Sequence, residues 1–245
     1  MPLLGVDTGG TFTDFVLIAN PGEQKGEQKT GIQVHKVLST PKAPEQAILQ
    51  GIHELGLTDN KDLVVVHGST VATNAVLEGK GVRTVFITNN GFRDMLTIGR
   101  QARSELYNLN PEKLSPPVPK ELCLETGGRL TASGEVLEPL TDQNITTLKE
   151  QIIKLAPESV AINLLFSWID DRFEKQIEEI IPDTIFVSRS SSILPEYREY
   201  ERGITTWLNA SVGPLVKKYL HRLCDGIPQA RVSVMQSAGG TIEAD

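Results

Sequence analysis

Residues with the types and spacing to do chemistry gather near the N-terminus, in the stretch GVDTGGTFTD at residues 5–14. Two glycines stand between two carboxylates, and three threonines surround the glycines. Glycine permits backbone conformations in which successive N–H groups point at one ligand, and its missing side chain lets an anion approach the main chain. With threonine hydroxyls as further donors, the stretch predicts an anion-binding turn. Its phosphate-binding residues would be Thr8, Gly9, Gly10, Thr11 and Thr13.

Asp7 ends the apolar lead-in to this turn and would face the same point. A carboxylate beside a phosphate is repelled unless a cation lies between them or the carboxylate orients a water molecule. We therefore expect Asp7 to hold Mg²⁺ or to orient a nucleophile beside a nucleotide's terminal phosphates, with Asp14 as the next candidate for a catalytic carboxylate. The stretch is neither a Walker loop nor a GxGxxG loop, and no helix follows it. An ordinary Gly-Gly hairpin with strand threonines is the alternative.

A second candidate site follows the apolar stretch DLVVV, where His67 ends a predicted strand and a predicted helix begins. A helix N-terminus after a strand suits an anion or a carbonyl group, because backbone N–H groups and the helix dipole point at the ligand. His67 could bind substrate or carry a proton. The alternative is a hydrogen-bonded structural histidine, with Ser69 as the helix N-cap. The candidate substrate-binding residues are His67, Gly68, Ser69, Thr70 and Asn74.

The hydrophobic pattern changes period along the chain, which predicts the fold class. Three strands come first and would form an antiparallel meander: 3–7, 14–19 and 32–38. Helices and further strands then alternate, as in α/β domains with parallel strands. The helices are predicted at 43–55, 70–81, 141–155, 170–181 and 202–226, and the strands at 62–69, 83–89, 159–166, 184–190 and 231–237. Residues 20–31 read as a surface loop, and 99–141 as mainly irregular with a hairpin around Ser133 and Gly134.

The composition is that of a globular protein: 245 residues, 39% hydrophobic and 22% charged. The net charge of -7 and the lack of a Lys/Arg block argue against a nucleic-acid partner. Cys123 and Cys224 stand outside any CxxC or Cys/His cluster, so we expect two reduced thiols in a cytoplasmic protein. The sequence has no signal-peptide pattern and no apolar run long enough to span a membrane, so no membrane partner is expected.

The remaining charged and aromatic residues are expected to be structural. Residues on irregular segments that would form ion pairs are Arg93, Asp94, Arg100 and Arg103. The stretch REYER at 198–202 would form a solvated face or a cap before the last helix, and Trp168 and Trp207 would lie in the core. Histidines without metal-ligand spacing, which predict no zinc site, are His35, His53 and His221.

The stretch VDTGGTFTD resembles the first phosphate loop of the hydantoinase A/5-oxoprolinase family, within the actin and sugar-kinase-like ATPase superfamily. Four further blocks are similar to that family in the same order: HGSTVATNAVLEGKGVRTVFITNNGFRD (67–94), IGRQARSELYNL (98–109), PEYREYERGITTWLNA (195–210) and VMQSAGGTIEAD (234–245). The resemblance covers almost the whole chain. It implies an α/β fold with an RNase H-like (actin-like ATPase) mixed sheet and flanking helices, as the first lobe of a two-lobed architecture.

The resemblance also implies an activity. Such enzymes are ATP-dependent hydrolases that open cyclic amides such as hydantoin or oxoproline by phosphorylating the amide oxygen, with ATP and Mg²⁺ as cofactors. Asp7 would hold the metal, Thr13 and Asp14 would support the loop, and His67 would face the substrate. The family commonly has threonine where this chain has Ser69, and the hydroxyl is kept. A second subunit or domain of the hydantoinase B type is the expected partner.

The resemblance divides the chain into a hydantoinase/oxoprolinase N-terminal domain at 1–185 and the truncated start of the following hydantoinase A domain at 186–245. Actin-like ATPases hold the nucleotide between two phosphate hairpins, and only one is recognisable here. SAGGTIEAD (237–245) lacks a preceding acid, and ETGGRLTASG (125–134) lacks an apolar lead-in. The 245 residues alone are therefore expected to be inactive. The alternatives are a ketone carboxylase subunit of the same family, a small-molecule kinase and a non-catalytic binding fragment.

Overall fold

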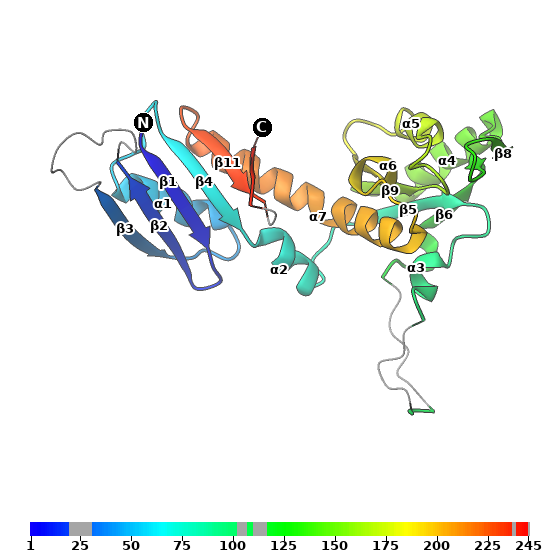
Figure 1. Cartoon of the computed structure of the whole chain (residues 1–245), viewed down its shortest axis with the longest axis horizontal. Helices are drawn as coiled ribbons and strands as arrows, with labels where there is room; N and C mark the ends of the chain where they lie inside the picture. Colours follow the sequence, from blue (N-terminus) through cyan, green and yellow to red (C-terminus); the bar gives the residue numbers. More distant parts are fainter. Residues whose placement is uncertain (20–30, 102–106, 110–116, 237–238, 245) are drawn as a thin grey trace. The chain divides into compact units, whose positions relative to one another are not determined.

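The computed structural model of the chain, shown in Figure 1, describes residues 1–19, 31–101, 107–109, 117–236 and 239–244. The chain forms two compact units. Unit 1 contains Met1–Glu78 and Leu215–Asp245, and unit 2 contains Gly79–Pro214. The domain boundary expected after residue 185 stays a prediction, and the compact units divide at other positions. Most of the surface loop expected at 20–31 lies outside the described residues, as does Arg103.

Unit 1 is built on a six-stranded mixed sheet in the order β12-β11-β4-β1-β2-β3. The first three strands form the predicted antiparallel meander: β1 (Leu3–Thr8), β2 (Phe12–Ile18) and β3 (Ile32–Leu38). The other strands are β4 (Val64–Ser69), β11 (Arg231–Met235) and β12 (Thr241–Glu243). β4 pairs parallel with β1, and β11 pairs parallel with β4. The meander followed by parallel strands is the RNase H-like arrangement that the resemblance implies.

One face of this sheet packs against helices α1 (Pro44–Glu54) and α7 (Glu199–Gly226), of which the part after Pro214 belongs to unit 1. The fit between α1 and β2 is tight. A Cβ atom on Gly51 of α1 would lie 2.1 Å from the ring of Phe15, a fully buried side chain of β2. The close contact fixes the position of β2, which begins at the candidate phosphate turn.

The opposite face of the sheet carries exposed apolar side chains along β3. The alternation of IQVHKVL predicts a half-buried strand, and the strand is confirmed. Its apolar positions Ile32, Val34 and Leu38, however, are 64%, 69% and 67% exposed. The alternate residues face the helices instead, since His35 Nε2 lies 2.6 Å from Glu54 Oε2 of α1. Periodicity identifies the strand, but the position of the helices decides which of its faces is covered.

Unit 2 contains a second sheet of four parallel strands in the order β10-β9-β5-β6 (Figure 1). The strands are β5 (Thr84–Asn89), β6 (Cys123–Thr126), β9 (Ser159–Asn163) and β10 (Phe186–Arg189). The helices are α3 (Met95–Ile98), α4 (Asp142–Leu155), α5 (Arg172–Glu178) and α6 (Ser190–Ile193). β5 and β9 are buried along their whole length, as expected for parallel strands covered on both faces.

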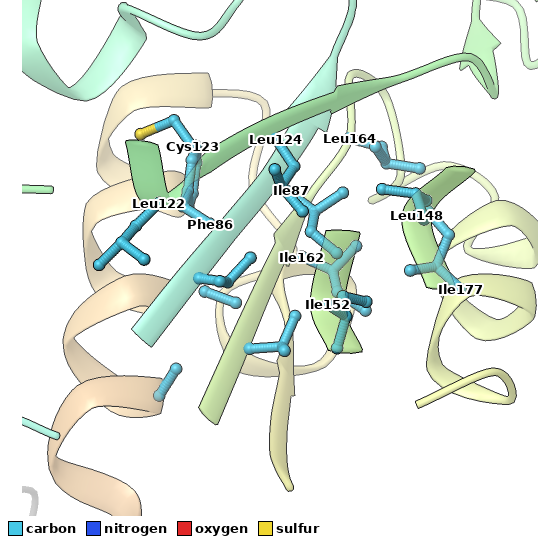
Figure 2. Close-up of a cluster of buried hydrophobic side chains, with 14 of the residues drawn as sticks. Phe86, Ile87, Leu122, Cys123, Leu124, Leu148, Ile152, Ile162, Leu164 and Ile177 are labelled. Atoms are coloured by element: carbon cyan, nitrogen blue, oxygen red, sulfur yellow. The ribbon is translucent and has the colours of Figure 1, made fainter. Parts of the chain in front are cut away.

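Figure 2 shows the core of unit 2, where Ile87 of β5 and Ile162 of β9 lie with Leu148 and Ile152 of α4. Cys123 at the start of β6 belongs to the same cluster. Burial raises the pKa of its thiol to about 11, so Cys123 stays protonated near neutral pH. This agrees with the expectation of a reduced thiol without chemistry.

The region from 99 to 141 contains more structure than predicted. The hairpin around Gly134 is confirmed as β7 (Arg129–Leu130) with β8 (Val136–Glu138). The segment Cys123–Thr126 instead joins the parallel sheet beside β5, after the short helix η1 (Lys120–Leu122). A strand of four residues is too short for a period to be recognised, which explains why the sequence did not predict it.

The stretch REYER does not form a solvated face throughout, since Arg202 is fully buried in unit 2. Its guanidinium donates to Asn163 Oδ1 at 3.0 Å and Ser190 Oγ at 3.1 Å. It also donates to the carbonyl oxygens of Leu164 at 2.6 Å and Glu196 at 2.8 Å. The expectation was wrong for this residue because a charged side chain is buried where several acceptors surround it, and those acceptors come from distant segments.

The two predicted core tryptophans differ in position. Trp207 packs against the core of unit 2, as predicted, whereas Trp168 is 38% exposed. Trp168 stands in the segment between β9 and α5. Among the described residues, no helix is long and apolar enough to cross a membrane.

Candidate functional site

The candidate phosphate turn joins β1 to β2. The N–H of Gly9 donates to the carbonyl oxygen of Phe12 at 3.0 Å, which closes the turn. Gly10 and Thr11 form its exposed tip, and among the described residues their N–H groups donate to no hydrogen bond. The turn therefore leaves two adjacent N–H groups available to an acceptor from outside the described residues, such as an anion.

The two glycines of the turn have different roles. A Cβ atom on Gly9 would lie 3.1 Å from the carbonyl oxygen of Phe12, so the closeness of the turn itself favours glycine there. A Cβ atom on Gly10 would meet no atom within 4 Å. Neither residue has a positive φ, so this turn does not use the backbone torsions that only glycine adopts easily. Gly10 thus leaves open space beside free N–H groups, and nothing in the fold requires it.

Ser39, which the sequence does not mark as a site residue, stabilises the turn through two hydrogen bonds. Its N–H donates to the carbonyl oxygen of Thr11 at 2.9 Å, and its hydroxyl donates to that of Gly9 at 2.8 Å. The buried Thr13 hydroxyl lies 3.0 Å from Ser39 Oγ and therefore donates to it. Ser39 follows β3, whose last residue Leu38 pairs with Phe12. The register of the meander, had it been known, would have placed Ser39 beside the turn.

Asp7 and Asp14 face each other across the β1–β2 pair, but their surroundings differ. Asp14 Oδ1 lies 2.9 Å from Lys36 Nζ, which partly neutralises it. Asp7 is exposed and makes no hydrogen bond or ion pair with the described residues. Its Oδ1 lies 3.5 Å from the position of a Cβ on Gly68, so the glycine after His67 leaves room for the carboxylate. Asp7 is the better placed of the two to bind a cation.

His67 is fully buried in unit 1. Its Nδ1 lies 3.4 Å from the carbonyl oxygen of Val6, and its Nε2 lies 2.5 Å from the hydroxyl oxygen of Tyr219 on α7. Burial lowers the pKa of His67, so the ring is neutral near neutral pH. The catalytic role expected for His67 stays a prediction, and its burial favours a supporting role.

The other predicted substrate-binding residues lie where β4 leads into α2 (Val71–Leu77), which is shorter than the helix predicted at 70–81. Thr70 Oγ1 donates to the carbonyl oxygen of Thr8 at 3.1 Å and so joins this segment to the phosphate turn. Asn74 Nδ2 donates to Thr70 Oγ1 at 3.4 Å. The N-cap of α2 is Thr70, without a side-chain cap bond, so Ser69 is not the N-cap that the alternative expected. Ser69 Oγ accepts the N–H of Val71 at 3.3 Å.

Thr8 carries a polar atom without a protein partner. The residue is 6% exposed, and its Oγ1 makes no hydrogen bond within the described part of the chain. In register it lies between Ser69 of β4 and Thr13 of β2, at the base of the turn. A buried hydroxyl without a partner carries a free-energy cost and is tolerated mostly where a ligand or water satisfies it.

These features can be tested against a magnesium–nucleotide complex. The N–H groups of Gly10 and Thr11 and the open space over Gly10 suit phosphate oxygens. The described residues contain no group of three or more His, Cys, Asp or Glu side chains that could hold a metal ion alone. Mg²⁺ in nucleotide sites usually takes one or two carboxylates and completes its shell with phosphates and water. A single carboxylate, Asp7, is therefore compatible with this kind of site.

Comparison with known proteins agrees with the fold and identifies the family. The sequence model described as the hydantoinase/oxoprolinase N-terminal region matches residues 3–185. An uncharacterised protein of Methanocaldococcus jannaschii is 34% identical, over 97% of this chain and 35% of its own length. The caprolactamase subunit alpha of Pseudomonas jessenii is 30% identical (90% of this chain, 32% of that protein), and the 5-oxoprolinase of Saccharomyces cerevisiae is 30% identical (98% and 22%).

Two solved structures share the fold. Nucleotide-free acetone carboxylase superposes with a TM-score of 0.83 at 24% identity, over 99% of this chain and 37% of that one. The ATP-dependent caprolactamase of Pseudomonas jessenii superposes with a TM-score of 0.79 at 28% identity, over 98% and 36%. The chain thus spans from about a fifth to about two fifths of the length of these proteins. By its sequence match over residues 3–185, the chain belongs to the hydantoinase/oxoprolinase family and carries that family's N-terminal region.

Proposed function

We propose that the chain supplies the phosphate-binding turn of an ATP-dependent hydrolase that opens cyclic amides. The observation that carries the proposal is the exposed tip at Gly10 and Thr11, whose N–H groups donate to no hydrogen bond within the described residues. Asp7, on the strand that leads into this turn, forms no ion pair with those residues. The names of relatives support ATP use and amide chemistry, since one is an ATP-dependent caprolactamase and others are 5-oxoprolinases.

The residues of the turn would have different roles in binding the nucleotide. When bound, MgATP would supply a phosphoryl group to the amide oxygen with release of ADP, which would make the amide carbon more electrophilic toward water. The N–H groups of Gly10 and Thr11 bind phosphate oxygens, while the buried Thr8 hydroxyl faces Tyr219 and supports the base of the turn. Asp7 binds Mg²⁺ or orients a water molecule. Thr13 keeps the turn in place through Ser39 and leaves its own hydroxyl unavailable to a ligand.

The substrate would bind beside the β4–α2 segment. Thr70 and Asn74 are exposed there and can hydrogen-bond a ring amide, while Gly68 leaves room near Asp7. Ser69 is partly buried and can contribute a hydroxyl. We assign His67 beneath this surface to positioning and Asp14, paired with Lys36, to supporting the turn.

The working enzyme would contain more than these 245 residues. The relative named caprolactamase subunit alpha supports a second subunit, which we propose to be of the hydantoinase B type in a cytoplasmic assembly. The described part of the chain offers one phosphate turn, and phosphoryl transfer depends mainly on positioning and electrostatic stabilisation. We therefore expect the chain alone to bind nucleotide weakly and to show no amide-stimulated ATP hydrolysis.

The experiment is an ADP-release assay on a longer protein that contains this chain. The substrates are hydantoins, oxoproline, other lactams and ketones, each with and without bicarbonate. The proposal predicts ADP release with a cyclic amide, independent of bicarbonate, together with a ring-opened carboxylate. A ketone that releases ADP only with bicarbonate would instead establish the carboxylase alternative, which the fold of acetone carboxylase makes the main rival. A stable phosphorylated product would indicate a kinase.

A further inference from the structure

A buried tyrosine on α7 contacts the histidine beneath the phosphate turn. Tyr219 is 2% exposed, and its hydroxyl oxygen lies 2.5 Å from His67 Nε2. The hydroxyl also faces the side chains of Ser69 and Thr8 at the ends of β4 and β1. The surrounding core is otherwise apolar, with Leu223 fully buried nearby in the same cluster. A phenylalanine would fill the same space without the cost of burying a hydroxyl, so the hydroxyl needs an explanation.

The contacts of His67 determine which of its ring nitrogens carries the proton. The carbonyl oxygen of Val6 can only accept, so Nδ1 must donate to it. Burial disfavours a second proton, which leaves Nε2 as an acceptor. The O–H of Tyr219 therefore donates to Nε2. The phenolic oxygen in turn remains an acceptor on the side of Thr8 and Ser69.

The contacts of His67 lie next to Asp7 in the sheet. His67 pairs in register with Val6, the residue before Asp7, and also bonds its carbonyl oxygen. Gly68, the residue after His67, pairs with Asp7 and borders its carboxylate. A ring held at both nitrogens fixes the ends of β1 and β4 on either side of that carboxylate. Replacing Tyr219 would therefore alter the position of the Asp7 carboxylate through the side chain of His67.

We propose that Tyr219 is a positioning residue for the Asp7 carboxylate and acts through the Nδ1–H tautomer of His67. The proposal rests on the proposed function, because it assigns Asp7 to the cation of a bound nucleotide. It makes a specific distinction. The position of Asp7 matters for Mg²⁺-dependent binding, whereas the N–H groups of Gly10 and Thr11 bind phosphate without it. Tyr219 should therefore affect the first kind of binding and leave the second unchanged.

The test compares nucleotide binding with and without Mg²⁺. ATP is titrated into the chain under both conditions, and the amide signals of Gly10 and Thr11 are followed by NMR. In Tyr219→Phe the affinity for MgATP should fall about fivefold, the scale of one lost hydrogen bond, with Mg²⁺-free ATP binding unchanged. Tyr200→Phe is the matched control, because it removes a hydroxyl from another tyrosine of α7, in unit 2, and should change neither affinity.

The protonated ring nitrogen of His67 can be identified by NMR, which gives a second test. The ¹⁵N signals of His67 should show a protonated Nδ1 and an unprotonated Nε2 in the wild type, and a mixed population in Tyr219→Phe. A wild-type Nε2–H tautomer would overturn the inference. Equal losses with and without Mg²⁺, or an unchanged MgATP affinity, would also overturn it.

Two further outcomes keep the inference separate from the proposed function and from simple unfolding. If ATP shifts no amide signal of the wild-type turn, the proposed function fails, and with it this inference. If Tyr219→Phe loses its fold by circular dichroism, His67→Gln tests the same contact from the other side and should show the same Mg²⁺-selective loss. If both variants unfold, the pair is structural only and the positioning role is rejected.

Discussion

At the scale of single residues, the site depends on groups that have no partner in the protein. Gly10 has open space around it and no positive φ, and Asp7 forms no ion pair within the described part of the chain. Structural needs explain Gly9, which is close to Phe12, and Thr13, which bonds Ser39. A ligand would explain the first two and is not needed for the last two.

Replacing Gly10 separates these roles. In Gly10→Val the new side chain would occupy the space over the free N–H groups, and the fold should be retained because no protein atom lies within 4 Å of the added Cβ. We expect nucleotide binding to be lost, measured by calorimetry in a protein that contains the whole site. Gly31→Val is the control, since Gly31 is also exposed, with open space and no positive φ. Equal affinities in the two variants would remove the phosphate role from the turn.

Replacing Asp7 and replacing Asp14 should have different effects on ATP hydrolysis. Asp7→Asn keeps the shape of the side chain but removes the charge, and we expect amide-dependent ATP hydrolysis to fall by at least about a hundredfold, as for other main electrostatic groups. Asp14→Asn should have a much smaller effect, because Asp14 is already paired with Lys36. Turnover by the Asp7 variant at a near wild-type rate would place the catalytic carboxylate elsewhere.

The sequence indicates a candidate site only where its residues are contiguous. Thr8, Gly9 and Gly10 were recognisable because two glycines and several hydroxyls follow each other after an apolar strand. Ser39 and Tyr219 were not, since each belongs to a segment whose distance from the turn depends on strand register and helix packing. Neither has a local pattern that distinguishes it from other serines and tyrosines.

At the scale of elements, the order of strands and helices was predictable and their partners were not. The meander and the alternation of helices and strands are confirmed. The pattern gave no sign that β4 and β11 share a sheet with the meander while β5 and β9 form another. Periodicity reports which face of a segment is apolar, and pairing depends on contacts between segments far apart in sequence.

The packing of α7 on β4 predicts how the free energy of unfolding depends on pH. Burial holds the pKa of His67 below its usual value of 6.5, so the folded chain binds fewer protons than the unfolded chain in that range. The free energy of unfolding should therefore fall as the pH drops through about 6.5. Urea titrations at pH 7.5 and 5.5 measure the difference, and His67→Gln should reduce it. An identical pH dependence in that variant would mean that His67 is not held neutral by the fold.

At the scale of the whole molecule, the chain provides one phosphate turn on a sheet of known type. Unit 1 contains the meander, the turn, Asp7 and the His67–Tyr219 pair, whereas unit 2 is a separate parallel sheet that holds the buried Arg202. The chain covers 35% of one relative and 22% of another, so these relatives are about three to five times as long as the chain. The proposed activity therefore concerns a longer protein, and the part of the proposal that this chain can test is phosphate binding.

The most direct test of that claim is a map of MgATP binding over the assigned amide signals of the 245-residue chain. The account predicts weak binding whose largest shifts lie at the tip of the β1–β2 turn, at Gly10 and Thr11, with smaller shifts at Thr8 and Gly68. Unit 2 should show no comparable shifts. The account is contradicted if MgATP leaves the signals of the turn unchanged at millimolar concentration, or if the largest shifts lie on residues away from the turn.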